Sequence, residues 1–203
     1  MPVYLVQQGR VPSATAIDIN SGPYESALTK VTEQNLRDKI TVLLGDGFDL
    51  LHVGQVEAAV LAGMGSSTMI GVLEAKPEVT ASLKQLVLQP MAGAAQIRKW
   101  LADNGWMIED EVMIEDDGFI YFVLSAVPGR QVIADWLSLE LGPVNLHKKP
   151  LLLKVYINKM LTDYESILLN LERAKSKKAE GKRSGLFEKI NLLRGVLRND
   201  FKS

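Results

Sequence analysis

Four short segments follow apolar runs in this chain, and they contain the residues best suited to chemistry. Asp18 lies near the end of the apolar segment Thr15–Ile19, where a carboxylate commonly binds a nucleoside ribose. An Asp-x-Asn sequence is also favourable in a turn, so both interpretations of Asp18 remain open. Asp46, between two glycines, could accept a hydrogen bond from an adenine amino group or simply belong to a β-turn.

The other two segments are Gly63-Met64-Gly65 and Gln89-Pro90. Glycines allow a ligand to approach the backbone closely, but the same glycines suit a tight turn from a strand into a helix. The amide of Gln89 could hold a substrate base, whereas a glutamine at such a place is more often a polar surface group. The sequence identifies no catalytic acid or base, so Gln89 and Pro90 are candidates only for contact with a substrate.

Other kinds of chemistry have little support in the sequence. His52 and His147 have no carboxylate pattern around them, so we expect no metal site. No Ser/His/Asp arrangement, phosphate-binding loop or paired-glutamate motif is present. The chain has no cysteine, and no apolar run approaches about 18 residues. We therefore expect a soluble, cytoplasmic protein that does not associate with a membrane.

Short apolar runs predict a parallel sheet that would position these four segments. Ile40–Leu44 and Ala58–Ala62 are too brief for helices and do not alternate, which is typical of strands buried on both faces. In open α/β sheets the ligand crevice lies at the carboxyl ends of such strands. The predicted strands are Thr15–Ile19, Lys39–Leu44, Ala58–Ala62 and Gln85–Gln89, followed by the hairpin Met107–Glu115 with Phe119–Ala126. The predicted helices between them are Pro2–Gly9, Pro23–Leu36, a short helix near Phe48–Val53, a helical stretch Ser66–Leu83 broken at Pro77, and Gly93–Asn104. This order predicts an α/β fold with a doubly wound sheet and an antiparallel end.

The C-terminal quarter has a helical pattern instead. Apolar residues recur there at alternating steps of three and four, the heptad spacing of a coiled-coil hairpin. They are Ile157, Met160, Tyr164, Ile167 and Leu171 in the first helix and Leu186, Ile190, Leu193 and Leu197 in the second. We therefore divide the chain into a sheet domain (1–128), a connector (129–150) and a helical hairpin (151–203).

Charge is distributed unevenly between these parts. Residues 1–150 carry 11 Lys or Arg and 18 Asp or Glu, a net charge of −7, whereas residues 151–203 carry 12 and 6, a net charge of +6. A basic region on an acidic body suggests a polyanionic partner, although a solvated helical surface explains it equally well. The candidate anion-binding residues are Lys175, Lys177, Lys178, Lys182, Arg183 and Arg194.

The motifs taken together resemble one known family. The succession LLGDG, LAGMG, LVLQP, IRKWLADNGW and a hairpin ending IYFVL is similar to the TrmK family, S-adenosylmethionine-dependent enzymes that methylate N1 of adenine 22 in tRNA. The later LGP, Pro150 and the heptad helices resemble the C-terminal coiled-coil domain of that family. The resemblance covers essentially the whole chain, and it implies a class I methyltransferase-like fold acting on tRNA.

The resemblance also implies roles for particular residues. Asp18 would bind the ribose of S-adenosylmethionine, Asp46 and Gly47 its adenine, and Gly63, Met64 and Gly65 would form the loop under the methyl donor. Gln89 and Pro90 would face the target base, and the basic hairpin would hold tRNA. Two residues depart from the expected pattern: Ser66 replaces a glycine after AGMG, and Met91 replaces an asparagine after LQP.

A larger departure concerns the front of the chain. The first, central strand of the family and its DIGSDHAYLP-type cofactor loop have no counterpart before Pro2. Without that strand, Thr15–Ile19 and Ala58–Ala62 would each keep an unpaired edge, unless they pair with each other. We expect a truncation caused by a mis-assigned start, and a monomer. The alternative is a catalytically inactive remnant that binds tRNA or a protein.

Overall fold

The computed structural model describes residues 1–172 and 177–201, and the chain divides into two compact units. The first unit comprises Met1–Glu57 and Ile70–Leu83. The second comprises Ala58–Met69 and the described residues from Lys84 onward. Each unit has its own sheet, and each is described by itself below.

The first unit contains a two-stranded parallel sheet. Its elements are α1 (Pro2–Gln7), β1 (Ala14–Asp18), α2 (Ser21–Glu33), β2 (Ile40–Leu44), the 3₁₀ helix η1 (Gly47–Leu50), the second half of α3 (Ser66–Ala75) and α4 (Pro77–Ser82). β1 and β2 pair in register from Ala14 with Ile40 to Asp18 with Leu44, so their carboxyl ends finish together. Val6, Val31 and Ile40 form a small buried cluster between the helices and this sheet.

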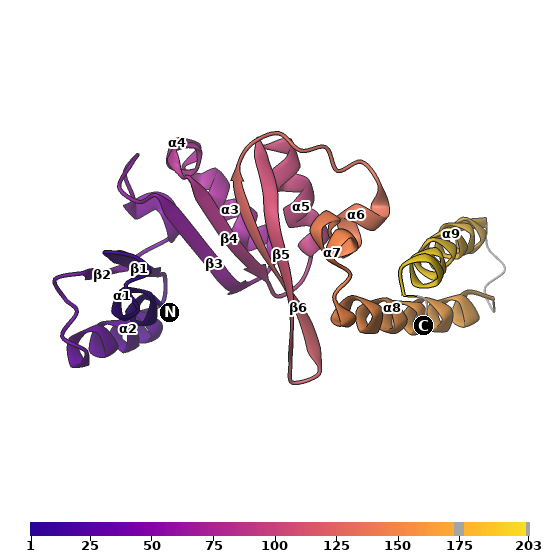
Figure 1. Cartoon of the computed structure of the whole chain (residues 1–203), viewed down its shortest axis with the longest axis horizontal. Helices are drawn as coiled ribbons and strands as arrows, with labels where there is room; N and C mark the ends of the chain where they lie inside the picture. Colours follow the sequence, from indigo (N-terminus) through magenta and orange to yellow (C-terminus); the bar gives the residue numbers. More distant parts are fainter. Residues whose placement is uncertain (173–176, 202–203) are drawn as a thin grey trace. The chain divides into compact units, whose positions relative to one another are not determined.

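The second unit contains a four-stranded mixed sheet in the order β3-β4-β6-β5 (Figure 1). The strands are β3 (Ala58–Met64), β4 (Gln85–Pro90), β5 (Trp106–Asp116) and β6 (Phe119–Pro128), and α5 (Ala94–Asp103) follows β4. β3 and β4 are parallel, whereas β6 is antiparallel to both β4 and β5. The β5–β6 hairpin turns at Asp117-Gly118, both with positive φ, as a type I′ turn requires.

One irregularity in β5 decides which of its side chains are buried. The register against β6 shifts between Ile108 and Asp110, which is a β-bulge. Before the bulge Trp106 and Ile108 are buried, and after it Glu111 and Met113 are buried. Since side chains alternate along a strand, the extra residue is what brings Glu111 to the same face as Ile108.

The predicted α/β fold is confirmed, with every expected strand and helix present within a few residues of its predicted bounds. The strands fall into two hydrogen-bonded sheets. In the part of the chain that the structure describes, β1 pairs only with β2, and β3 pairs only with β4.

The segment expected to be a connector holds two further helices, α6 (Trp136–Leu141) and α7 (Pro143–Lys148). Asp135 caps α6 by accepting a hydrogen bond from the Ser138 N–H at 2.8 Å. Hydrogen bonds from the side chain and the N–H of Ser138 lower the pKa of the Asp135 carboxyl group. Gly142, at φ +93°, ends α6, and Pro143 occupies the first turn of α7. These short helices were missed because neither is long enough to show a periodic apolar pattern.

The C-terminal hairpin consists of α8 (Leu151–Glu172) and α9 (Lys177–Asp200), which pack side by side (Figure 1). Its buried residues on α8 are Leu153, Ile157, Met160, Leu161 and Leu168. The predicted core position Ile167 is wrong, because this side chain is 44% exposed. A straight helix has 3.6 residues per turn, so a seam that begins at Ile157 drifts from a strict heptad and reaches Leu168 instead.

Among the described residues, no helix combines the length and the apolar character that crossing a lipid bilayer requires.

Candidate functional site

Asp18 and Asp46 lie at one edge of the first unit, where β1 and β2 end. The N–H of Gly45 donates to the carbonyl of Asp18 at 2.9 Å, which fixes the two strand ends against each other. The Asp18 carboxylate accepts a hydrogen bond from the Asn20 N–H on Oδ1 at 2.8 Å, the contact of a turn residue. No donor within residues 1–172 and 177–201 occupies its Oδ2, so this oxygen can still bind a ligand. Asp46 is exposed, and its side chain does not cap η1.

The loop that carries Asp46 is fixed by contacts with Lys76 and Val72. The Lys76 ammonium donates to the carbonyls of Asp49 at 2.7 Å and Leu51 at 3.1 Å. Gly47 has φ +45°, and a Cβ there would lie 2.8 Å from a methyl group of Val72. Any larger residue would therefore push the loop away from α3. Sequence reasoning missed Lys76, because an isolated lysine before a proline carries no pattern of its own.

In the second unit, the segments after β3 and β4 are joined by a side chain. β3 is irregular between Ala62, which faces Gln89, and Met64, which faces Pro90, and Gly63 between them has φ +76°. At this irregularity the Gly63 N–H donates to the side-chain Oε1 of Gln89 at 2.9 Å. The structure thus brings together Gly63 and Gln89, for which the sequence predicted different ligands.

Further contacts join the same two loops. The Met91 N–H donates to the Met64 carbonyl at 3.0 Å, and the Ser66 N–H donates to the Ala92 carbonyl at 3.3 Å. The Ser66 hydroxyl, in a residue only 6% exposed, donates to Oε1 of Gln96 at 2.5 Å. Ser66 is one of the two departures from the family pattern, and its hydrogen bonds connect the segment after β3 with the segment after β4. Met91, the other departure, is exposed.

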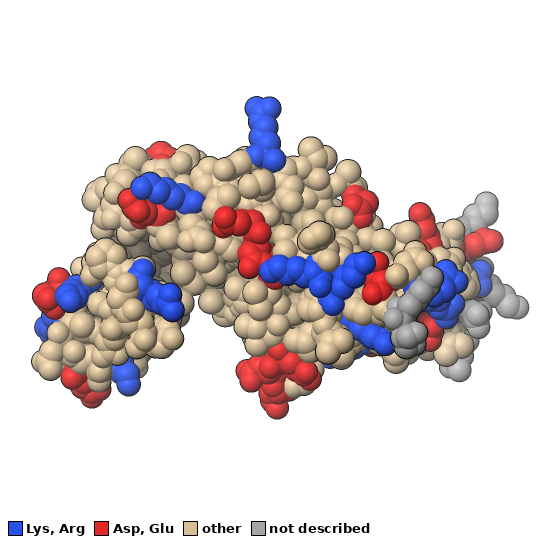
Figure 2. Space-filling model, viewed as in Figure 1, with Lys and Arg blue, Asp and Glu red and all other residues tan. Residues whose placement is uncertain are grey.

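The basic residues of the C-terminal hairpin have mixed surroundings. Lys182 is exposed, Arg183 is half-buried, and Arg194 forms an ion pair with Glu165 at 2.8 Å. Lys177 and Lys178 lie in the first turn of α9, but their side chains, like the whole of Lys175, are outside the described residues. Figure 2 shows basic and acidic side chains close together on this hairpin. Among the described residues, no three His, Asp or Glu side chains are arranged to hold a metal ion.

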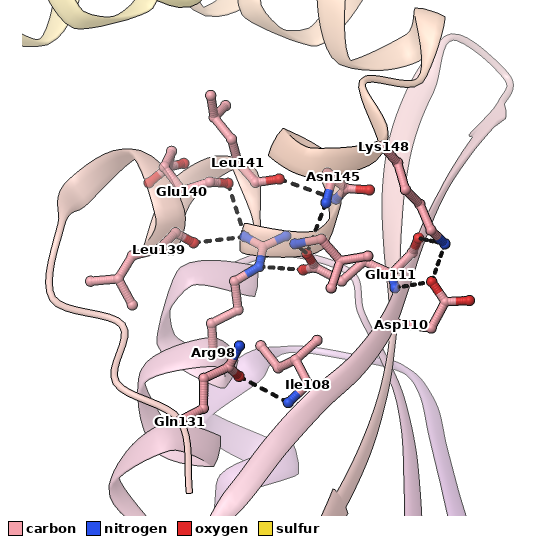
Figure 3. A network of polar contacts seen from close by, with 11 residues as sticks. Arg98, Ile108, Asp110, Glu111, Gln131, Leu139, Glu140, Leu141, Asn145 and Lys148 are labelled. Atoms are coloured by element: carbon pink, nitrogen blue, oxygen red, sulfur yellow. Dashed lines mark hydrogen bonds and ion pairs between the residues drawn. The ribbon is translucent and has the colours of Figure 1, made fainter.

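A buried ion pair between Arg98 and Glu111 is the largest polar feature that sequence reasoning missed (Figure 3). Arg98 Nε donates to Glu111 Oε1 at 2.6 Å, and Nη1 donates to the carbonyls of Leu139 and Glu140 at 2.7 and 2.9 Å. Both charged side chains are completely removed from solvent. The guanidinium also lies 4.7 Å from the centre of the Phe122 ring.

The other carboxylate oxygen of Glu111 binds the start of α7. It accepts hydrogen bonds from the N–H groups of Val144 at 3.0 Å and Asn145 at 3.3 Å. Gly142 lies so close that any Cβ there would collide with the Glu111 carboxylate. The pair therefore connects β5 and α5 with both α6 and α7, the segment that leads into the C-terminal hairpin.

Parallel strands that end in glycine-rich and acidic loops, followed by a helical C-terminal region, define an α/β protein of the Rossmann-like methyltransferase class. Residues 1–195 match the family TrmK, described as tRNA (adenine(22)-N(1))-methyltransferase. The chain belongs to this family, and the resemblance seen in its motifs is confirmed.

Individual relatives agree with this assignment. The tRNA (adenine(22)-N(1))-methyltransferase of Bacillus subtilis is 36% identical over 143 residues, which cover 70% of this chain and 60% of that protein. A putative tRNA methyltransferase of Mycoplasma pneumoniae is 32% identical over 174 residues, covering 81% of this chain and 79% of that protein. The alternative of an inactive remnant receives no support from these matches.

Solved structures show the same fold. The crystal structure of B. subtilis TrmK superposes with a TM-score of 0.88 at 30% identity, covering 97% of this chain and 86% of that one. Streptococcus pneumoniae Sp1610, a putative tRNA (m1A22) methyltransferase crystallised with S-adenosyl-L-methionine, superposes with a TM-score of 0.79 at 28% identity, with coverage of 97% and 86%.

Proposed function

We propose that this chain transfers the methyl group of S-adenosylmethionine to N1 of adenine 22 in tRNA. The observation that carries the proposal is the family match over residues 1–195. It is supported by the S-adenosyl-L-methionine complex of the similar S. pneumoniae protein. The proposed division into a sheet domain (1–128), connector (129–150) and helical hairpin (151–203) assigns the cofactor to the first part and tRNA to the last. We further infer a cytoplasmic monomer.

The residues at the two strand edges fit the proposed cofactor. A ribose offers hydroxyl donors, and Asp18 has a carboxylate oxygen without a donor in the described residues. An adenine offers an amino group, and Asp46 beside Gly47 is an exposed carboxylate acceptor. At Gly63 and Gly65 even an added Cβ would have no atom within 4 Å, so a ligand can approach the backbone that includes Met64.

The proposed chemistry needs few protein groups. S-adenosylmethionine supplies an electrophilic methyl group, and adenine N1 is already nucleophilic through its lone pair. Catalysis is therefore mainly a matter of holding the two reactants in line. Gln89 and Pro90, beside the Gly63 loop, are proposed to hold the target base. No residue is assigned as the base that removes a proton from the adenine amino group.

The assay that tests this function uses two tRNA transcripts. The purified chain is incubated with S-adenosylmethionine carrying a labelled methyl group and with a tRNA that has either adenine or guanine at position 22. We expect methyl transfer only to the adenine form, with the product identified as 1-methyladenosine by nucleoside mass spectrometry. Absence of transfer to the adenine form, or equal labelling of both transcripts, contradicts the proposal.

A salt titration tests the proposed role of the hairpin in tRNA binding. Lys175, Lys177, Lys178, Lys182, Arg183 and Arg194 are the proposed phosphate ligands, and Arg194 is the weakest of them because Glu165 already balances its charge. Replacing Lys177, Lys178, Lys182 and Arg183 by alanine should weaken tRNA binding. It should also flatten the slope of log affinity against log salt, by roughly 0.7–0.9 for each phosphate that the variant no longer neutralises.

The matched control for this titration replaces Lys30 and Lys99, two exposed lysines outside the hairpin. The control should leave the salt slope unchanged, and neither variant should alter affinity for S-adenosylmethionine. Identical slopes for the hairpin variant and the unmodified chain would mean that tRNA is held elsewhere.

A further inference from the structure

Gln96 is an exposed glutamine whose side chain is nevertheless held in one orientation. It lies in the first turn of α5, and its Oε1 accepts the 2.5 Å hydrogen bond from the hydroxyl of Ser66. Ser66 is itself fixed, since it is buried and its N–H donates to the Ala92 carbonyl. An exposed glutamine normally samples several rotamers, whereas this hydrogen bond restricts the side chain of Gln96.

The absence of a side chain at Gly93 leaves space for the hydrogen bond between Ser66 and Gln96. Gly93 has φ +80°, and a Cβ at this position would collide with the Ser66 hydroxyl. A glycine is therefore required here both by the backbone conformation and by the hydroxyl that holds Gln96. The hydrogen bond between Ser66 and Gln96 therefore depends on a glycine at position 93.

The hydrogen bond from Ser66 determines which end of the Gln96 amide remains available to a ligand. A carboxamide has an acceptor end and a donor end. Because Oε1 of Gln96 is occupied by Ser66, its Nε2 is the free end, and no acceptor for it is present in the described part of the chain. Gln89 is similar, since Gly63 occupies its Oε1 and only long contacts reach its Nε2, 3.4 Å to the Pro90 carbonyl and 3.7 Å to Met91 Sδ.

We propose that Gln96 is a substrate-positioning residue whose Nε2 donates a hydrogen bond to an acceptor atom of the RNA next to the reacting adenine. With Gln89 it gives this edge two N–H donors, so the edge selects a ligand that presents acceptors, such as ring nitrogens or ribose and phosphate oxygens. Adenine N1 must face the methyl group, which leaves the other acceptors of the nucleotide for these amides. This inference rests on the proposed function.

The decisive variant is Gln96→Glu. A carboxylate keeps an oxygen for the Ser66 hydroxyl, so the local structure is preserved, but the N–H donor is replaced by a negatively charged acceptor. At saturating S-adenosylmethionine we expect kcat/KM for tRNA to fall at least about tenfold. Ser66→Ala leaves the amide intact but free to rotate, and should cost about 2- to 12-fold. Affinity for S-adenosylmethionine, measured by calorimetry, should stay unchanged in both variants.

The matched control is Gln131→Glu. Gln131 also uses its Oε1, as the acceptor of the Ile108 N–H at 2.9 Å, but it lies beyond β6 in the segment before α6. It should behave like the unmodified chain. A Gln96→Glu variant within about twofold of the unmodified kcat/KM overturns the inference. So does an equal loss of cofactor affinity, because Gln96 would then act on the cofactor. The unmodified chain is assayed before the variants. If it does not methylate tRNA, the proposed function is overturned together with this inference.

Discussion

Replacing Glu111 by alanine should lower the free energy of unfolding by about 3–5 kcal/mol, the usual cost of removing one partner of a buried ion pair. The Arg98 guanidinium would keep the carbonyls of Leu139 and Glu140 but lose its counter-charge in a site without solvent. The N–H groups of Val144 and Asn145 would lose their acceptor at the same time. Urea unfolding followed by circular dichroism measures the change.

Asp110→Ala is the matched control, because Asp110 is the adjacent residue and also forms an ion pair. Its partner is Lys148, and both side chains are nearly half exposed, so this pair should contribute no more than about 1 kcal/mol. A double variant, Arg98→Met with Glu111→Leu, should recover much of the loss, because it leaves no unpaired charge in the interior. If Glu111→Ala costs no more than Asp110→Ala, the pair does not stabilise the fold as described.

Asp18→Asn should weaken S-adenosylmethionine binding about 10- to 150-fold, which corresponds to the roughly 1.5–3 kcal/mol of a hydrogen bond to a charged group. Asparagine keeps an Oδ1 for the Asn20 N–H, so the turn should persist. It loses the negative charge and puts an amide N–H in place of the second oxygen, where a ribose hydroxyl would donate. The substitution therefore separates the ligand-binding interpretation of Asp18 from its turn role.

Calorimetry on the variant and the unmodified chain measures this loss, with thermal unfolding as a check on the fold. Asp49→Asn is the control, since Asp49 is an exposed aspartate in η1 of the same unit. It should leave affinity unchanged. Unaltered affinity in Asp18→Asn would leave Asp18 as a turn residue only, and the ribose contact would have to be sought elsewhere.

Local signals explain why most elements were predictable from the sequence. Pro77 divides the helical stretch into α3 and α4, and Asp117-Gly118 forms the hairpin turn, because these residues restrict the backbone wherever they occur. The unalternating runs Ile40–Leu44 and Ala58–Ala62 became the parallel strands β2 and β3, as predicted. Their expected burial on both faces is wrong, because only Ile40 and Leu61 are buried in these two runs.

The contacts that build the candidate site were not predictable in the same way. The bond from Gly63 to Gln89 joins residues that are 26 positions apart, and it depends on a bulge opposite Pro90 that no short pattern reveals. Charged residues are expected on the surface, yet Arg98 and Glu111 are buried, so hydrophobicity alone could not have predicted where they lie. Their pairing follows from tertiary packing alone.

The bulge in β5 limits how the length of this strand can vary among related sequences. Deleting one residue between Ile108 and Asp110 would exchange the two faces of the rest of the strand, since successive side chains point in opposite directions. Glu111 would then point toward solvent and lose its ion pair with Arg98. Val112 and Ile114, which are exposed in the structure, would point inward. Gaps in this family should therefore gather at the Asp117-Gly118 turn, and where one falls within the strand, a compensating change at the buried arginine should accompany it.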